Sequence, residues 1–160
     1  MVNDLKKVST DPVVIGSTSL NILLYADDII LLSQSKAGLQ SSLNILHIFC
    51  SSWNLQVNTS KSKIIVFNSN GKSFLNCFSY NNILLETVTS YCYLGIVLKY
   101  NGNFGLAIEM LMDKARKAYF KIKKTVGLDN SCGLLEKLFD SLVSPILLYG
   151  SEVWGVDCTL

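Results

Sequence analysis

Residues 20–32 read LNILLYADDIILL, and this stretch decides the fold of the first part of the chain. Two adjacent carboxylates, Asp27 and Asp28, lie between two short aliphatic runs that are partly β-branched. Such runs predict two buried strands with the acids at the turn between them. Ionised carboxylates are costly in apolar surroundings unless they are paired, hydrogen-bonded or metal-bound, and two side by side also repel each other. The fold is therefore expected to offset the cost of placing these two charges side by side near apolar strands.

Two interpretations of Asp27 and Asp28 follow from their chemistry. The first is a hairpin tip, because Asp is common in turns. Asp-Asp is nevertheless a poorer two-residue turn than Asn-Gly, because a type I′ turn needs positive φ at both positions. The second is a divalent-metal site, because Mg²⁺ prefers carboxylate oxygens together with substrate phosphates. The residues alone leave both interpretations open.

Composition predicts one ordinary domain, or a piece of a larger one, within these 160 residues. Apolar residues make up 49% and charged residues 16%, against usual values of about 45–50% and about 25%. A chain so poor in charge is expected to bury surface against another segment or partner. The net charge of +2 gives no overall nucleic-acid signature, so any basic patch must be local.

Cysteine usage and the polar N-terminus predict an intracellular protein of the nucleus or cytoplasm that is not secreted. The five cysteines are odd in number and lack a C-x-x-C pair, which indicates reduced, mostly buried thiols rather than a zinc site or disulfides. Residues 20–32 are too short to span a bilayer, so no membrane partner is expected.

The pattern of the remaining first hundred residues predicts a helix and several short strands. An apolar stripe predicts a helix over 35–54, with Trp53 in the core and His47 as a packed edge residue rather than a ligand. Further strands are expected at 13–15, pairing with the 20–32 hairpin, and over 64–67, 74–85 and 91–98. Asn81-Asn82 is a plausible hairpin turn within the third of these segments.

Two helices are predicted in the last sixty residues. The turn 101–103 precedes a long helix that ends near Val126, and a second amphipathic helix spans 134–146, where Pro145 ends or kinks it. On the first helix, one face opposite the apolar stripe carries four lysines: Lys114, Lys117, Lys121 and Lys124. Such a face is commonly just solvated, and it is also what a phosphate-binding helix needs.

The motif Tyr25-Ala26-Asp27-Asp28 resembles the catalytic hairpin of reverse transcriptases, in the form used by non-LTR (LINE-type) retrotransposons. Three further blocks resemble that family in the right order. WNLQVN at 53–58, followed by KSK at 61–63, is similar to the next palm motif, and YLGI at 93–96 is similar to the primer-grip hairpin. LFDSLV at 138–143 and PILLYGSEVWG at 145–155 are similar to the segment after the thumb helix.

This resemblance implies an α+β fold: a small, mainly antiparallel palm-type sheet with one packed helix, then a helical thumb-like segment. Residues 1–100 would be the C-terminal part of the palm and residues 101–160 the thumb-like segment. The implied reaction is Mg²⁺-dependent nucleotidyl transfer from a dNTP to a DNA primer on an RNA template. The implied catalytic residues are Asp27, Asp28 and Lys61, and the two aspartates would also bind Mg²⁺.

The resemblance further implies nucleic-acid contacts at Tyr25, at the turn of Tyr93, Leu94 and Gly95, and at the lysine face Lys114, Lys117, Lys121 and Lys124. Alternatives remain at several of these positions. Lys61 and Lys63 are equally consistent with a solvated pair before a strand. Gly95 is equally consistent with tight hairpin packing, since a glycine permits close approach.

The chain also departs from the family. A polymerase site needs a further carboxylate from an earlier palm strand, and that strand and the fingers are not recognisable, because Asp4 and Asp11 lack the expected aromatic-rich context. The expectation is a fragment that is inactive alone and that an upstream palm and fingers segment would complete. A nucleic-acid-binding remnant without catalysis and a non-functional transposon relic remain as alternatives.

Overall fold

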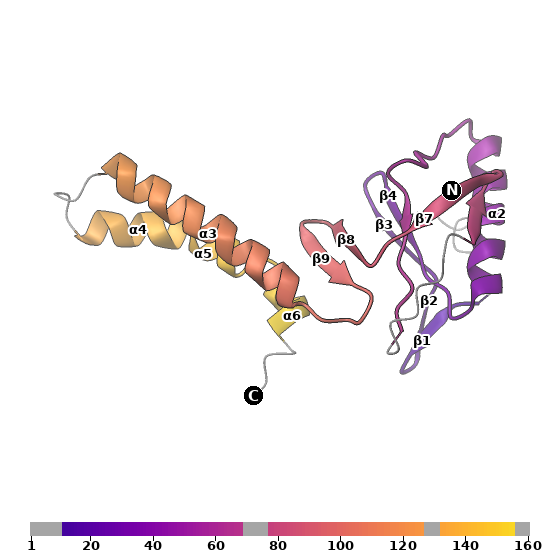
Figure 1. The fold of residues 1–160 in the computed structure, drawn as a ribbon, viewed down its shortest axis with the longest axis horizontal. Helices are drawn as coiled ribbons and strands as arrows, with labels where there is room; N and C mark the ends of the chain where they lie inside the picture. Colours follow the sequence, from indigo (N-terminus) through magenta and orange to yellow (C-terminus); the bar gives the residue numbers. More distant parts are fainter. Residues whose placement is uncertain (1–10, 69–76, 127–131, 156–160) are drawn as a thin grey trace. The chain divides into compact units, whose positions relative to one another are not determined.

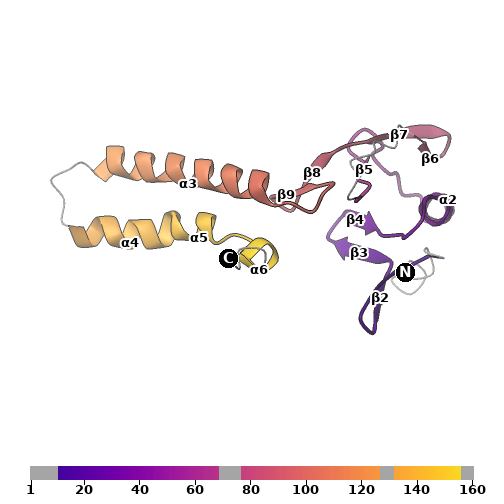
Figure 2. The ribbon, with the colours of Figure 1, turned by 60° about the horizontal axis from the view of Figure 1, so that its bottom comes forward.

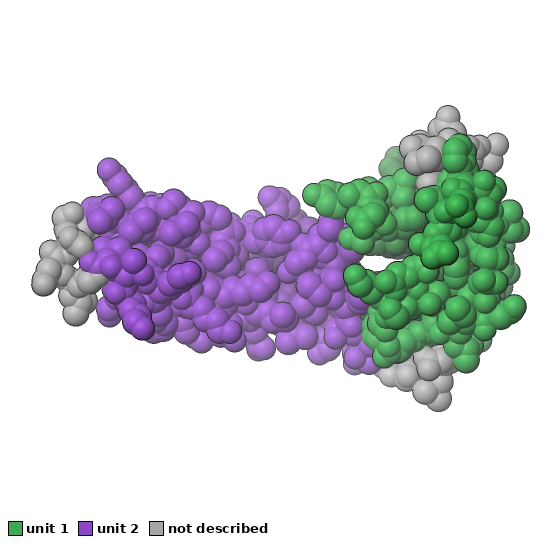
Figure 3. Space-filling model, turned by 90° about the horizontal axis from the view of Figure 1, so that it is seen from above, with its two compact units in different colours: residues 1–66, 73–88 green, residues 67–72, 89–160 purple. Residues whose placement is uncertain are grey.

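A computed structural model of the chain describes residues 11–68, 77–126 and 132–155 (Figure 1). The chain divides into two compact units, residues 1–66 with 73–88 and residues 67–72 with 89–160 (Figure 3). The first unit contains short strands and the helix α2. The described residues of the second contain one hairpin and the helices α3 to α6. None of the described helices combines the length and the apolar character needed to span a bilayer.

Two consecutive hairpins begin the first unit. Strand β1 (Val13–Ile15) pairs antiparallel with β2 (Thr18–Leu20), and β3 (Ile22–Tyr25) pairs antiparallel with β4 (Asp28–Leu31). The prediction that 13–15 would pair with the second hairpin is wrong. Gly16, at φ 61°, lets the chain reverse at once, so β1 finds its partner in the next strand.

Helix α2 (Lys36–Ser52) confirms the predicted helix and begins at a side-chain cap. The Ser35 hydroxyl accepts a hydrogen bond from the Gly38 amide at 3.1 Å, which satisfies one of the amides left open at a helix start. Trp53 follows the last helical residue, and its side chain is 54% exposed, so the prediction of a core tryptophan is wrong. The helix ends before Trp53 can continue the buried stripe.

A three-stranded sheet in the order β5-β7-β6 faces α2. Strand β6 (Phe78–Tyr80) pairs antiparallel with β7 (Ile83–Thr87), whereas β5 (Lys63–Ile64) pairs parallel with β7. Both residues of the turn Asn81-Asn82 have positive φ, which confirms the predicted hairpin turn. The predicted strand 64–67 is shorter than expected. Residues 74–76 of the predicted strand lie outside the described residues.

The core of the first unit joins α2 to this sheet. Seven side chains form the cluster: Leu43, Leu46, Cys50, Ile64, Phe78, Tyr80 and Leu85. Ile22 and Leu31 pack against it from the β3–β4 hairpin. Cys50 is buried, as predicted for the thiols, but Cys92 is exposed.

A hairpin lies at the start of residues 89–160 of the second unit, where the strand pattern predicts one strand and the resemblance at 93–96 implies a hairpin. Strand β8 (Ser90–Tyr93) pairs antiparallel with β9 (Ile96–Lys99), and the chain reverses at Leu94-Gly95. Leu94 and Gly95 have φ of 46° and 84°, so both turn residues are left-handed. The prediction of a continuous strand over 91–98 is therefore wrong.

Helix α3 (Gly105–Val126) lies alongside α4 (Cys132–Leu142) and α5 (Ser144–Leu147), as Figure 2 shows, and α6 (Ser151–Trp154) follows. The buried centre of this helical segment is Ala115, Ile122 and Val143. Pro145 lies in the first turn of α5, where a proline needs no amide hydrogen, so the predicted break near it is confirmed. The mixture of helices with small, mainly antiparallel sheets confirms the α+β class.

Candidate metal and nucleic-acid site

The β3–β4 hairpin presents Asp27 and Asp28 at its tip. Tyr25 pairs with Asp28, so Ala26 and Asp27 form the turn and Asp28 is the first residue of β4. Ala26 has φ 52°, a left-handed conformation that side-chain-bearing residues seldom adopt. Strained backbone of this kind occurs often at functional sites. The hairpin therefore fixes two consecutive acids at a tight, strained turn.

The two strands that carry these acids are not buried within the described part of the chain. Side chains of Leu23, Leu24 and Tyr25 on β3 are 41%, 42% and 61% exposed, and Ile29 on β4 is 40% exposed. The prediction of two buried strands is therefore wrong. Among the described residues, the two strands pair only with each other, and Ile22 and Leu31 are their side chains that pack on the core. Asp27 and Asp28 are both exposed, so water solvates them.

The carboxylates fit a divalent cation in part. Mg²⁺ takes oxygen ligands and commonly uses only one or two carboxylates, with water and substrate phosphates completing its shell. Asp27 and Asp28 supply such oxygens. Within residues 11–68, 77–126 and 132–155, no group of three or more acidic, His or Cys side chains is placed to hold a metal ion. A further carboxylate for a two-metal arrangement would have to come from elsewhere.

Asp11 is occupied as a structural group. Its Oδ2 accepts hydrogen bonds from the Ser33 hydroxyl at 3.1 Å and the Ser35 hydroxyl at 2.6 Å. Both hydrogen bonds lower the pKa of the Asp11 carboxyl, and the bond from Ser35 has the larger effect. Asp11 thus supports the start of α2. The sequence pattern did not reveal this role, because the partners are more than twenty positions away.

Lys61 and Lys63 occupy different surroundings. The Lys63 ammonium forms an ion pair with the Glu86 carboxylate across the β5–β7 pair. Lys61 is exposed in the turn before β5, where its backbone amide donates to Asn58 Oδ1 at 3.2 Å. The structure therefore gives Lys63 a structural partner in its own unit.

His47 lies edge-on to the Tyr80 ring, with ring centroids 5.3 Å apart, as a packed edge residue.

The turn of the β8–β9 hairpin holds Tyr93, Leu94 and Gly95 together. Tyr93 is half-buried, and Leu94 is 39% exposed. The Tyr149 hydroxyl donates to the Leu94 carbonyl at 2.6 Å. Tyr149 carries no prediction from sequence beyond its place in the PILLYGSEVWG block. Its contact with a turn 55 positions earlier leaves no local signal.

Helix α3 exposes its predicted lysine face. Lys114, Lys117, Lys121 and Lys124 are all exposed, whereas Ala107, Leu111, Ala115 and Ile122 are buried. Arg116 donates to Asp113 at 3.0 Å, one helical turn earlier. Lys123 and Lys124 lie in the last turn, where cations interact favourably with the helix dipole. The helix therefore presents a row of cations to water.

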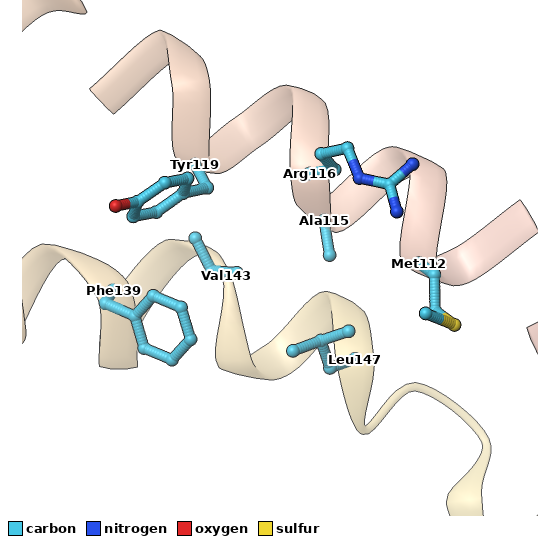
Figure 4. Close-up of a pocket in the computed structure, with 7 residues that line it drawn as sticks. All are labelled: Met112, Ala115, Arg116, Tyr119, Phe139, Val143 and Leu147. Carbon is cyan, nitrogen blue, oxygen red and sulfur yellow. The ribbon is translucent and has the colours of Figure 1, made fainter. Parts of the chain in front are cut away.

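An open groove of about 220 Å³ lies between α3 and the pair α4–α5. Figure 4 shows its lining, which is apolar apart from Arg116 and the Tyr119 hydroxyl: Met112, Ala115, Arg116, Tyr119, Phe139, Val143 and Leu147. Met112 and Tyr119, which line the groove from α3, are 48% and 42% exposed.

The comparisons with known proteins agree with the motifs. The chain is 28% identical over 143 residues to the RNA-directed DNA polymerase from mobile element jockey of Drosophila melanogaster. It is 30% identical over 147 residues to an uncharacterized transposon-derived protein of Caenorhabditis elegans. These matches cover 84% and 91% of this chain, but only 16% and 53% of the two relatives. No solved structure shows a significant match.

A second Drosophila relative, named as a probable RNA-directed DNA polymerase from transposon BS, is 28% identical over 82% of this chain and 16% of its own length. The chain thus spans about half, or less, of the relatives that it matches. The sequence pattern of the family described as reverse transcriptase (RNA-dependent DNA polymerase) matches residues 1–98. The resemblance to reverse transcriptases of non-LTR retrotransposons is confirmed. The chain belongs to the reverse transcriptase family.

Proposed function

We propose that this chain is part of an RNA-directed DNA polymerase and contributes its catalytic hairpin and its duplex-gripping helix. Residues 1–100 act as the C-terminal part of a palm, and residues 101–160 as the thumb-like segment. The observation that carries the proposal is the strained two-residue turn that presents Asp27 and Asp28 at a hairpin tip, inside the stretch that matches the family.

Each predicted site residue has a role in this proposal. Asp27 and Asp28 would hold Mg²⁺, and the ion would supply positive charge for the attacking and leaving oxygens of the transfer. Lys61 lies near the dNTP triphosphate. Tyr25 and the turn Tyr93-Leu94-Gly95 contact the primer and template. The lysine face of α3 contacts the phosphates of the RNA–DNA duplex.

A second candidate function is a nucleic-acid-binding module without catalysis. The exposed cations at Lys114, Lys117, Lys121 and Lys124 support it, because phosphate contacts need only positive charge in water. Both functions require that the chain bind nucleic acid. A non-functional relic does not, so duplex binding separates the two functions from the relic.

The experiment is fluorescence anisotropy with primed RNA–DNA duplexes across a salt series. Three or four phosphate contacts predict a log–log slope of roughly −2 to −4, at about −0.9 per contact. Changing Lys114, Lys117, Lys121 and Lys124 to Gln keeps helix propensity and removes the charge. The slope should flatten by about 0.9 for each phosphate that the variant no longer neutralises, equally for duplexes of unrelated sequence.

A control variant carries Lys36→Gln and Lys137→Gln, two exposed lysines on other helices. Its salt slope should remain that of the parent protein. If the parent and the quadruple variant bind duplex alike, or if neither binds at low salt, the lysine face is only a solvated surface and the duplex-gripping role is wrong.

A further inference from the structure

Two residues between α5 and α6 hold the turn of the β8–β9 hairpin. Besides the 2.6 Å hydrogen bond from the Tyr149 hydroxyl to the Leu94 carbonyl, the Tyr149 ring covers Gly95. Its Cε1 lies 3.1 Å from the point where a Cβ on Gly95 would stand. The ring and hydroxyl of one side chain therefore contact both residues of the turn.

Gly150 makes the neighbouring contact. It has φ 68°, and a Cβ built there would lie 2.2 Å from Cδ1 of Ile96, the first residue of β9. Any side chain at this position would displace Ile96, since real Cβ atoms do not approach so closely. The Trp154 indole nitrogen donates to the Tyr149 carbonyl at 2.9 Å, so α6 ties down the backbone that carries Tyr149.

The β8–β9 hairpin requires contacts of this kind for its stability. An isolated two-stranded hairpin is at best marginally stable in water. Its turn also places Leu94, which is not a glycine, at φ 46°, and such backbone persists only where the surroundings hold it. The hydroxyl of Tyr149 bonds the carbonyl of that same strained residue.

We propose that Tyr149 is a positioning residue, which fixes the β8–β9 turn so that Tyr93, Leu94 and Gly95 present a constant surface to nucleic acid. The inference deepens the proposed function and rests on it for the nucleic-acid contact. The positioning contact itself is a property of the free protein, because all its residues belong to one compact unit.

The test compares the full chain with its Tyr149→Phe variant, which keeps the ring and removes the hydroxyl. Hydrogen exchange of the amides of residues 93–96 should become about three- to tenfold faster, the opening expected when one hydrogen bond is removed. The urea midpoint should fall by no more than the free energy of this one hydrogen bond, because the variant keeps the ring and Tyr149 is 49% exposed. Tyr119→Phe, which removes an exposed hydroxyl on α3, is the matched control and should leave this exchange unchanged.

The same variants are then titrated with the primed RNA–DNA duplex. Tyr149→Phe should weaken binding by a similar factor while the salt slope stays that of the parent, because the lysines are intact. Unchanged exchange at residues 93–96 would overturn the positioning role. Faster exchange with unchanged duplex affinity would support the positioning role and overturn the proposed contact between this turn and nucleic acid.

Discussion

Tyr80 completes the core of the first unit with its ring and carries a hydroxyl that the fold keeps protonated. Its side chain is only 6% exposed, and the ring meets His47 edge-on. Burial raises the pKa of Tyr80 to about 12, with a further contribution from the neighbouring Cys50 thiol. Desolvation disfavours the phenolate, so the folded state binds this proton more tightly than the unfolded chain does.

The raised pKa of Tyr80 predicts a loss of stability at high pH. Its contribution is complete below the ordinary pKa of 10 and is lost as the pH rises through about 12. The free energy of unfolding should fall by up to about 2 kcal/mol over this range, at about 1.4 kcal/mol per pKa unit. Urea titrations between pH 9 and 12 measure it. In Tyr80→Phe the free energy of unfolding should fall less steeply with pH, and in Tyr119→Phe it should fall as in the parent protein. Equal falls in all three proteins would contradict the assignment of the effect to the Tyr80 hydroxyl.

Residue types were easier to predict from the sequence than their burial. The sequence predicts a hairpin with Asp27 and Asp28 as its turn, and the observed turn, Ala26-Asp27, lies one residue earlier. The apolar side chains around the acids are exposed, because burial depends on which segments cover a strand. Trp53 continues the helical spacing of the α2 stripe, yet the helix ends one residue earlier. The contact of Tyr149 with Leu94 joins distant positions, so no local pattern announces it.

The elements that follow from local rules were predicted well. Helices α2 and α3 follow from their apolar spacing, and the β6–β7 turn follows from Asn81-Asn82, because asparagine tolerates positive φ. The β8–β9 reversal was missed in the strand pattern because its first turn residue, Leu94, is not a turn-forming type. The short β5 and its parallel pairing with β7 depend on distant partners, which periodicity does not identify.

The strain of the β3–β4 hairpin can be measured through Ala26. A non-glycine residue in the left-handed conformation costs about 1–2 kcal/mol, and glycine avoids this cost. Glycine also gives the unfolded chain more conformational freedom, which lowers the stability by about 0.4–1 kcal/mol. Ala26→Gly should therefore raise the free energy of unfolding by about 0.5–1 kcal/mol in urea. The matched control, Ala118→Gly inside α3, should lower it by about 1 kcal/mol. A loss of stability in both variants would contradict the left-handed turn.

For the molecule as a whole, the predicted site residues belong to two compact units. The hairpin tip and Lys61 belong to the first, and the β8–β9 turn and the lysine face belong to the second. Apolar side chains on β3 and β4 are exposed, and charged residues make up only 16% of the chain. Both observations indicate an apolar surface that is suited to packing against another segment. The curated relatives extend well beyond the matched region, which is only 16% of each of the two Drosophila proteins.

The incomplete carboxylate set predicts that this chain alone does not extend a primer. A two-metal phosphoryl transfer needs acids beyond Asp27 and Asp28, and Asp11 is occupied by Ser33 and Ser35. The assay is dNTP incorporation on primed RNA with Mg²⁺ or Mn²⁺. We expect no incorporation above background. Incorporation that disappears in Asp27→Asn would show that the chain completes its own catalytic site.

The central claim is that the β3–β4 tip is the metal-binding end of a polymerase site, and Mn²⁺ tests it most directly. In a titration followed by amide NMR, paramagnetic broadening should begin at residues 25–28 and be absent there in the Asp27→Asn, Asp28→Asn variant. Asp113→Asn, which removes the exposed partner of Arg116, should leave the broadening unchanged. Broadening that survives in the double variant, or that begins around Asp113 instead of the hairpin tip, would contradict the claim.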